Sequence, residues 1–198
     1  MKRIFVVKSG TAHTIPDFSI KDIPGTSGRL DVVCRCLISA FGKKREKQNT
    51  DFYGLLEGEP LPPRLIAVEG RRLQRLPDDE FEVAKIMSQL LGKPSEVEKV
   101  LDEWPGISIC PKNFNRITDE LKGEGALFYL HQKGQDIRDF DFPRDNHLVF
   151  VMGDHMGLGK ADENVLRGLG AIQISVGPLT YLASQCITLV HEELDWKL

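Results

Sequence analysis

Residues 148–159 read LVFVMGDHMGLG and residues 171–180 read AIQISVGPLT, and the chain is built around these two stretches. Each stretch opens with an apolar run of strand length, rich in β-branched residues, and each run is followed by a glycine. In open α/β sheets, ligands bind beyond the carboxyl ends of the strands, and glycine there lets the backbone approach a ligand closely. The two glycine turns therefore predict one ligand pocket.

The sequence around these turns alternates between strand and helix patterns. Strands are expected at 126–130, 148–152 and 172–176, and helices at 162–169 and 180–194. Alternation of this kind implies parallel strands joined by crossover helices. The sequence therefore predicts an α/β fold with a mainly parallel sheet flanked by helices.

The first part of the chain adds further elements. They are a strand at 4–7, a helix at 30–41, strands at 51–56 and 64–68, a helix at 77–91 with Phe81 on its apolar face, a helical continuation at 96–101, a strand at 107–110 and a helix at 114–121. The short proline-rich connection at 57–63 predicts an antiparallel hairpin. We interpret residues 1–198 as a single domain in which residues 43–77 contain this hairpin elaboration.

The first long helix has a polar face close to its start. Arg29, Asp31 and Arg35 lie on that face. Thr26 or Ser27 can cap the helix. Asp31 and Arg35 are four residues apart, so they can pair on the helix surface, which contributes only ~0.2–0.5 kcal/mol. On spacing alone, a structural ion pair is the simpler interpretation.

Charge is distributed unevenly along the chain. The formal net charge is -3, yet residues 1–75 carry fourteen lysines and arginines against eight aspartates and glutamates. This excess indicates a surface that faces a polyanion, although a solvated basic face would explain it as well. The basic run at 43–47 has the same two interpretations. The charge density is too low for a protein that coats nucleic acid, so any RNA contact would be local and structured.

Length and hydropathy limit the class of protein. With 198 residues and 41% hydrophobic content, the chain can bury a sizeable core. The N-terminal apolar run is too short for a signal peptide, and no run approaches the ~20 apolar residues of a membrane span. We therefore expect a cytoplasmic protein without a membrane partner.

The cysteine pattern argues against disulfides and against a metal site. Cys34, Cys36, Cys110 and Cys186 are expected to be reduced and buried. Cys34 and Cys36 are two positions apart on a helix and point in different directions, so they cannot share a tetrahedral metal. We expect no metal.

Several familiar motifs are missing from the glycine turns. Gly153, Gly157 and Gly159 do not have the G-x-G-x-x-G spacing of dinucleotide-binding folds, and no lysine followed by serine or threonine completes a phosphate loop. No G-x-S-x-G elbow is present. Histidines near strand ends, such as His155, are more often structural than catalytic. The turns therefore need another ligand chemistry.

The motifs in both parts of the chain resemble one family. PGTSGRLD at 24–31 with CRC at 34–36, GDHMGLG at 153–159, and SVGPLT at 175–180 followed by QCI at 185–187 closely resemble the archaeal tRNA (pseudouridine(54)-N1)-methyltransferases of the SPOUT superfamily. The resemblance extends over almost the whole chain, and it includes the proline-rich hairpin.

The resemblance implies a SPOUT-type fold with a C-terminal trefoil knot, and a homodimer in which the knotted regions of two subunits pack together. It also implies S-adenosyl-L-methionine as the cofactor. Carried over position by position, the cofactor-binding residues are Leu130, Gly153, Ser175, Val176, Gly177, Pro178, Leu179, Thr180 and Cys186. An apolar slot and the peptide groups of glycine turns suit an adenine ring.

The reaction that the resemblance implies is methylation of N1 of pseudouridine 54 in the T-loop of tRNA. The C-glycosidic link of pseudouridine leaves an N1–H that can be deprotonated, so no covalent cysteine adduct is needed. The candidate catalytic residues are Asp31, as base or hydrogen-bond acceptor, and Arg29 and Arg35, which would hold a phosphate or the uracil carbonyls. Two alternatives remain open. One is a related knotted methyltransferase that modifies pseudouridine in small-subunit ribosomal RNA, and the other is a non-catalytic RNA-binding protein of the same fold.

Overall fold

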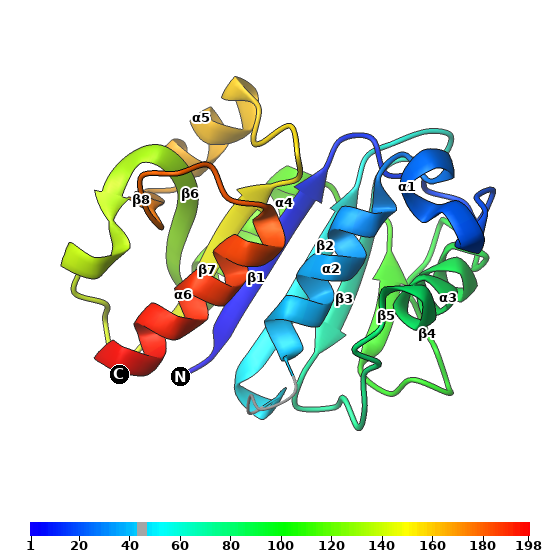
Figure 1. Cartoon of the computed structure of the whole chain (residues 1–198), viewed down its shortest axis with the longest axis horizontal. Coiled ribbons are helices and arrows are strands. Elements are labelled where there is room, and N and C mark those ends of the chain that lie inside the picture. Colours follow the sequence, from blue (N-terminus) through cyan, green and yellow to red (C-terminus); the bar gives the residue numbers. More distant parts are fainter. Residues whose placement is uncertain (43–46) are drawn as a thin grey trace.

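The computed structural model describes residues 1–42 and 47–198, and these residues form one mixed sheet with helices on both faces (Figure 1). The strand order is β4-β5-β3-β2-β1-β7-β6-β8. The strand bounds are β1 Arg3–Ser9, β2 Thr50–Leu56, β3 Arg64–Glu69, β4 Lys99–Val100, β5 Ile107–Cys110, β6 Gly125–Asp136, β7 His147–Gly153 and β8 Ile172–Ser175. The first strand of the chain therefore lies inside the sheet, between β2 and β7.

Parallel pairing dominates the half of the sheet that carries the two glycine turns. β1 pairs in parallel with β2 and β7, and β6 pairs in parallel with β7 and β8. β3 pairs antiparallel with β2 and β5, and β4 pairs antiparallel with β5. The predicted α/β fold with a mainly parallel sheet is confirmed. The predicted hairpin is the β2–β3 pair, which continues the main sheet.

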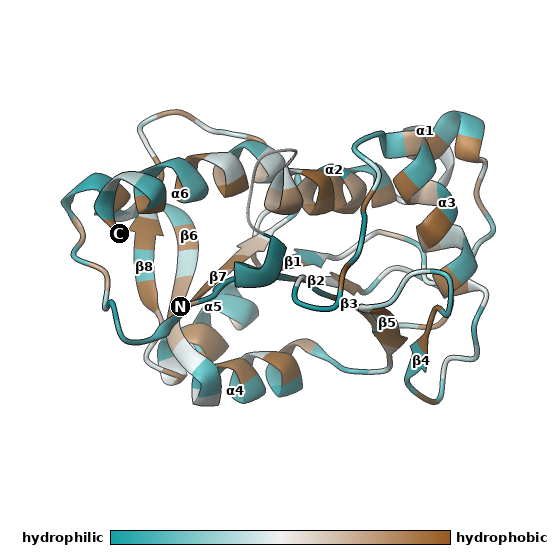
Figure 2. Cartoon of the chain, turned by 90° about the horizontal axis from the view of Figure 1, so that it is seen from below, coloured by the Kyte–Doolittle hydropathy of each residue, from teal (hydrophilic) through white to brown (hydrophobic). Residues whose placement is uncertain are grey.

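Helices cover both faces of this sheet (Figure 2). The helix bounds are α1 Ile23–Thr26, α2 Leu30–Phe41, α3 Glu80–Leu91, α4 Phe114–Glu124, α5 Lys160–Gly168 and α6 Ala183–Lys197, with 3-10 turns η1 Ile20–Asp22, η2 Lys47–Asn49 and η3 Ile137–Asp139. α2, α3 and α6 pack on one face, and α4 and α5 pack on the other. The start of α2 lies next to Ser27, whose hydroxyl accepts a hydrogen bond from the Leu30 N–H at 3.0 Å.

The sequence of β1 explains its internal position. Ile4, Phe5, Val6 and Val7 have no exposed surface. Phe5 and Val7 join the core beneath α2 and α6, whereas Ile4 and Val6 join the core beneath α4 and α5. Side chains alternate between the two faces of a strand, so a strand covered on both faces must be apolar throughout.

Residues 96–101 do not form the expected helical continuation. They contain β4, in which Lys99 pairs with Ile109 and Val100 pairs with Ser108 at the edge of the sheet. Val97 and Val100 are both exposed at this edge. Pairing with the open edge of β5 prevails over this weak helical pattern, because β-branched valines suit a strand.

Two other expectations are corrected. Phe81 does not face the core: it is 42% exposed, and the Lys85 ammonium lies 4.4 Å from its ring centroid. The last helix begins at Ala183 and not at residue 180, because Leu182 before it has an extended backbone. The Leu182 N–H at the helix start donates to Gln185 Oε1 at 2.9 Å.

Residues 43–46, which make up most of the predicted basic run, lie outside the described residues. Within the described part of the chain, no helix is both long and apolar enough to cross a lipid bilayer. The cysteines are free thiols; three are buried and Cys186 is half-buried. No cluster of three metal-ligating side chains occurs among residues 1–42 and 47–198.

Candidate functional site

A cavity of about 470 Å³ lies where the two glycine turns meet. Its walls come from β6, β7 and β8, from the turns that follow β7 and β8, and from α2 and α6. The predicted cofactor-binding residues that line it are Leu130, Gly153, Ser175, Val176, Gly177, Leu179, Thr180 and Cys186. Pro178 belongs to the same turn but is not a lining residue. The volume suits a small organic ligand.

The turn after β7 requires glycine for close packing. A Cβ atom on Gly153 would lie 2.1 Å from the carbonyl carbon of Gly157, so no side chain fits there. Asp154 holds the turn in place. Its Oδ1 accepts from the Met156 N–H at 2.9 Å, and its Oδ2 accepts from the Ser9 hydroxyl at 2.7 Å. The turn is therefore fixed to the end of β1.

The turn after β8 is held by its own side chains and by β6. The Ser175 hydroxyl donates to the Gly177 carbonyl at 3.1 Å. Gly177 has a φ of 146°, a backbone angle that residues with a side chain rarely adopt. A Cβ atom at this position would lie 3.3 Å from the Tyr181 ring. Gln132 donates to Thr180 Oγ1 at 2.6 Å. The segment between β8 and α6 is thereby joined to β6 across the pocket.

The mouth of the pocket is apolar and exposed. Met156 is 76% exposed, Leu179 is 66% exposed and Leu182 is 59% exposed, and all three line the cavity. Exposed apolar side chains that gather at one place mark a contact surface for a ligand or a partner. The mouth is therefore suited to an apolar or aromatic group.

Cys186 contributes an uncharged wall. Burial raises the pKa of the Cys186 thiol to about 11. At neutral pH the side chain is thus a thiol and not the nucleophilic thiolate. It acts as a small apolar group in the pocket.

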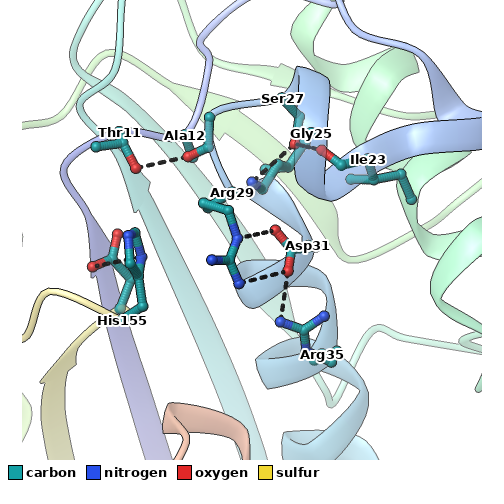
Figure 3. A network of polar contacts seen from close by, with 12 residues as sticks. Thr11, Ala12, Ile23, Gly25, Ser27, Arg29, Asp31, Arg35 and His155 are labelled. Carbon is teal, nitrogen blue, oxygen red and sulfur yellow. Dashed lines mark hydrogen bonds and ion pairs between the residues drawn. The ribbon is translucent and has the colours of Figure 1, made fainter.

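The three predicted catalytic residues form one network at the start of α2 (Figure 3). Asp31 Oδ1 accepts from Arg29 Nε at 3.0 Å, and its Oδ2 accepts from Arg35 Nη2 at 2.6 Å and from Arg29 Nη2 at 3.2 Å. Both arginines line the cavity, whereas Asp31 is 1% exposed and does not. The pair expected on the helix surface is therefore a network in which the carboxylate of Asp31 is buried and the side chains of Arg29 and Arg35 stay partly exposed. The guanidinium groups face the pocket, and the carboxylate lies behind them.

The backbone before α2 places Arg29. Gly28 and Arg29 have φ values of 61° and 75°, in the left-handed region. The Thr11 hydroxyl donates to the Gly28 carbonyl at 2.7 Å, and the His13 N–H donates to the Ser27 carbonyl at 3.0 Å. A left-handed conformation costs a residue other than glycine ~1–3 kcal/mol, and such strain clusters at ligand sites. The segment that follows β1 thus holds Arg29 in a strained conformation at the pocket.

Charge in the network is permanent at neutral pH. Burial raises the pKa of the Asp31 carboxyl, but the hydrogen bonds and charges of Arg29 and Arg35 outweigh burial, so that this pKa lies below its ordinary value. The hydrogen bond and the charge of Asp31 raise the pKa of Arg29. The two arginines therefore offer positive charge and N–H donors to an anion or to carbonyl oxygens.

Some lining residues were missed by the sequence-based prediction. Gln132 and Tyr181 follow a predicted strand and a glycine turn but belong to no quoted motif, whereas Gln185 belongs to the QCI motif at 185–187 without having been assigned to the site. His155 was interpreted as structural, yet it lines the cavity. Its position directly after the end of a central strand was the available signal.

The fold defines the class of protein. The chain superposes on the crystal structure of Archaeoglobus fulgidus Nep1 bound to S-adenosylhomocysteine with a TM-score of 0.64, over 99% of this chain and 98% of that chain, at 17% identity. A second structure, the putative methyltransferase Lpg2936 from Legionella pneumophila in complex with SAM, gives a TM-score of 0.50 over 98% of this chain and 66% of that chain, at 14% identity. The fold is that of the SPOUT methyltransferases.

Sequence comparison then gives the family. The chain belongs to the family described as "Putative SAM-dependent RNA methyltransferase", which matches residues 2–197. It is 41% identical over 194 residues to the tRNA (pseudouridine(54)-N(1))-methyltransferase of Methanococcus vannielii, covering 96% of this chain and 97% of the relative. It is 39% identical over 198 residues to the enzyme of the same name from Thermococcus gammatolerans, covering 98% and 96%. The family resemblance seen in the motifs is confirmed.

Proposed function

We propose that this protein is an S-adenosyl-L-methionine-dependent methyltransferase that methylates N1 of pseudouridine 54 in the T-loop of tRNA. The observation that carries the proposal is that Arg29 and Arg35 line the same cavity as both glycine turns. A methyl donor between the turns would therefore meet an acceptor base held by the arginines. The names of the relatives from Methanococcus and Thermococcus support this reaction.

The pocket fits the proposed donor. Its lining combines apolar side chains, such as Leu130 and Leu179, with the peptide groups of the two turns. There is no room for a side chain at Gly153 and little room for one at Gly177. Peptide N–H and carbonyl groups can bind the edge of an adenine ring, and the apolar side chains can cover its faces. When bound, S-adenosyl-L-methionine supplies an electrophilic methyl group on a positively charged sulfur.

The arginines suit the proposed acceptor. Uracil carbonyls and RNA phosphates are hydrogen-bond acceptors, and guanidinium groups present donors in a fixed planar arrangement. Asp31 fixes both guanidinium groups, and Glu80 also accepts from Arg35 at 3.3 Å. Held in this way, Arg29 and Arg35 would align the base with the donor, and alignment is a large part of catalysis in a displacement reaction.

Transfer RNA is favoured over ribosomal RNA as the acceptor because identity to the relatives named for tRNA extends over almost the whole chain. A non-catalytic RNA-binding role would not require a pocket of this volume beside the arginines. We extend the proposal to a homodimer, to a C-terminal trefoil knot, to a single domain spanning residues 1–198 and to a cytoplasmic location. The exposed apolar residues Leu179 and Leu182 support the dimer, because a second subunit would bury them.

The test is methylation of paired transcripts. Purified protein and labelled donor are incubated with a tRNA transcript that carries pseudouridine at position 54 and with one that carries uridine there, and the nucleosides are identified by mass spectrometry. We expect N1-methylpseudouridine from the first transcript alone. A small-subunit ribosomal RNA fragment that contains pseudouridine is the third substrate. Equal methylation of the two tRNA transcripts, or preference for the ribosomal fragment, would contradict the proposal.

A further inference from the structure

We infer that His155 accepts the N1 proton of the pseudouridine, and that Asp154 orients the imidazole for this step. The inference rests on the proposed function and names the base that the reaction needs. Methylation at N1 requires loss of the N1 proton, so a proton acceptor must lie within hydrogen-bond reach of that atom.

Asp31 is poorly placed for this role. Its two carboxylate oxygens accept three guanidinium N–H donors, its side chain does not line the cavity, and Arg29 and Arg35 lie between it and any ligand. The hydrogen bonds that fix the arginines also make the carboxylate a weaker base. Asp31 is therefore a positioning residue for the two arginines.

His155 lies in the cavity with the arginines, and its side chain is 33% exposed. In the view of Figure 3, Arg29 lies between Asp31 and His155. His155 Nδ1 is 3.6 Å from Asp154 Oδ1. This distance exceeds a hydrogen bond, but a nearby carboxylate favours the tautomer with the proton on Nδ1, which leaves the lone pair on Nε2. Nε2 has no hydrogen-bond partner within the described part of the chain, so it can accept from a ligand.

Asp154 is itself rigid. Its side chain is 2% exposed, and its two oxygens accept from the Met156 N–H and the Ser9 hydroxyl. A carboxylate fixed in this way can orient a neighbouring imidazole without becoming protonated, as in the arrangement of serine hydrolases.

The other titratable and charged groups of the cavity do not fit the role. His131 Nδ1 accepts from the Lys133 N–H at 3.0 Å, and its Nε2 lies 3.8 Å from Glu163, so both ring nitrogens face protein groups. Arg29 and Arg35 offer only N–H donors, Cys186 is a neutral thiol, and the Tyr181 phenol carries its own O–H proton. Among the lining residues that the structure describes, His155 is therefore the imidazole with a ring nitrogen open to accept from the base.

The step conserves atoms and charge. The N1–H bond of the base breaks and the proton forms a bond with Nε2 of His155, while N1 keeps the electron pair. That pair forms the bond to the methyl carbon as the carbon–sulfur bond breaks, and its electrons remain on a neutral sulfur. His155 then releases its proton to solvent, which restores the neutral imidazole.

The first experiment is an NMR measurement on the intact protein with 15N-labelled histidine. S-adenosylhomocysteine is added first, followed by a tRNA with pseudouridine 54 or with uridine 54. In uridine, N1 carries the sugar and has no hydrogen, so only the pseudouridine transcript can donate to Nε2. We expect the His155 Nε2 resonance to shift more with pseudouridine, and equal shifts would overturn the inference.

The second experiment measures the rate of methyl transfer against pH at saturating donor and RNA. We expect His155→Gln to lower kcat by about 10²-fold and to abolish the decrease of kcat at acidic pH. Donor affinity, measured by calorimetry, should stay within about threefold of that of the original protein. Added imidazole should restore part of the rate to His155→Ala. His147→Gln, at the far end of β7, is the matched control and should leave the profile unchanged.

Three results would overturn the inference: an unchanged acidic limb in His155→Gln, loss of that limb in His131→Gln instead, or absence of imidazole rescue. Failure of the proposed function would be seen differently, because the original protein itself would then not methylate the pseudouridine transcript.

Discussion

The Ser9 hydroxyl donates to Asp154 Oδ2 at 2.7 Å, although the two residues are 145 positions apart in the sequence. Both side chains are buried. Ser9 Oγ also accepts from the Ala12 N–H at 3.3 Å, in the segment whose Thr11 holds the carbonyl of Gly28. The end of β1 therefore contacts both halves of the pocket, the glycine turn on one side and the support of Arg29 on the other.

Loss of this hydrogen bond should weaken both folding and donor binding. In Ser9→Ala, one oxygen of a buried carboxylate loses its donor, so we expect the free energy of unfolding to fall by ~1–3 kcal/mol. Donor affinity, measured by calorimetry, should fall as well because the turn loses an anchor. Ser39→Ala, on α2 and outside the pocket, is the control. A Ser9→Ala protein with unchanged stability and donor affinity would contradict this account.

Gly153→Ala should weaken donor binding without unfolding the chain. The added Cβ atom would lie 2.1 Å from the Gly157 carbonyl carbon, so the turn must open. We expect donor affinity to fall by at least about tenfold, or ~1.4 kcal/mol. Gly123→Ala is the matched control, because a Cβ atom there meets nothing within 4 Å. If Gly153→Ala binds the donor as well as Gly123→Ala does, the turn is not part of the donor site.

Asp31→Asn should affect RNA binding more than donor binding, because Asp31 fixes Arg29 and Arg35 but does not line the cavity. We expect KM for tRNA to rise about tenfold, while the donor Kd changes little. Glu82→Gln, an exposed change on α3, is the control. A large loss of kcat at an unchanged KM would instead give Asp31 a direct part in the chemistry.

Asp31 should also make the free energy of unfolding depend on pH. The pKa of the Asp31 carboxyl is lower in the folded protein than its ordinary value, because the arginines outweigh the effect of burial. The unfolded chain therefore binds this proton first on acidification. The stabilising contribution is complete above the ordinary pKa of about 3.9 and is lost as pH falls through the lower folded value. Urea titrations from pH 6 downward should show a smaller loss in Asp31→Asn than in the original protein, and parallel losses would refute the assignment.

Cys186 should react slowly with iodoacetamide. Its thiol pKa of about 11 means that at pH 8 its thiolate fraction is roughly 10²-fold below that of a free cysteine. The labelling rate, followed by mass spectrometry, should rise with pH up to about 11. S-adenosylhomocysteine should slow it further by covering the thiol, and a rate that is insensitive to this ligand would place the donor elsewhere.

Much of the fold could be predicted because its signals are local. The apolar run at 148–152 and the glycine that ends it predict a buried strand and a turn whatever the rest of the chain does. The prediction of a helical continuation at 96–101 was wrong for the opposite reason, because Lys99 and Val100 become a strand only by pairing with the edge of β5. Burial of Asp31 is likewise a tertiary effect, since spacing alone gives only a surface pair.

The pocket shows the same division. The glycine turns of the pocket could be predicted from the sequence, because close packing of the backbone requires glycine at a fixed position after the strand. The neighbourhood of His155, Arg29 and Asp154 depends on β1 lying beside β7, which no local pattern encodes. Histidine after a strand is common, so its part in the site becomes visible only when the cavity is known.

The internal position of β1 also governs when the site can form during synthesis. β1 is made long before its neighbour β7, which begins at residue 147, and a further wall of the pocket comes from α6. Contacts between residues so far apart in the sequence form slowly, because chain entropy is lost before the contacts stabilise the fold. A nascent chain on the ribosome therefore cannot hold the donor until β7 and α6 have both emerged.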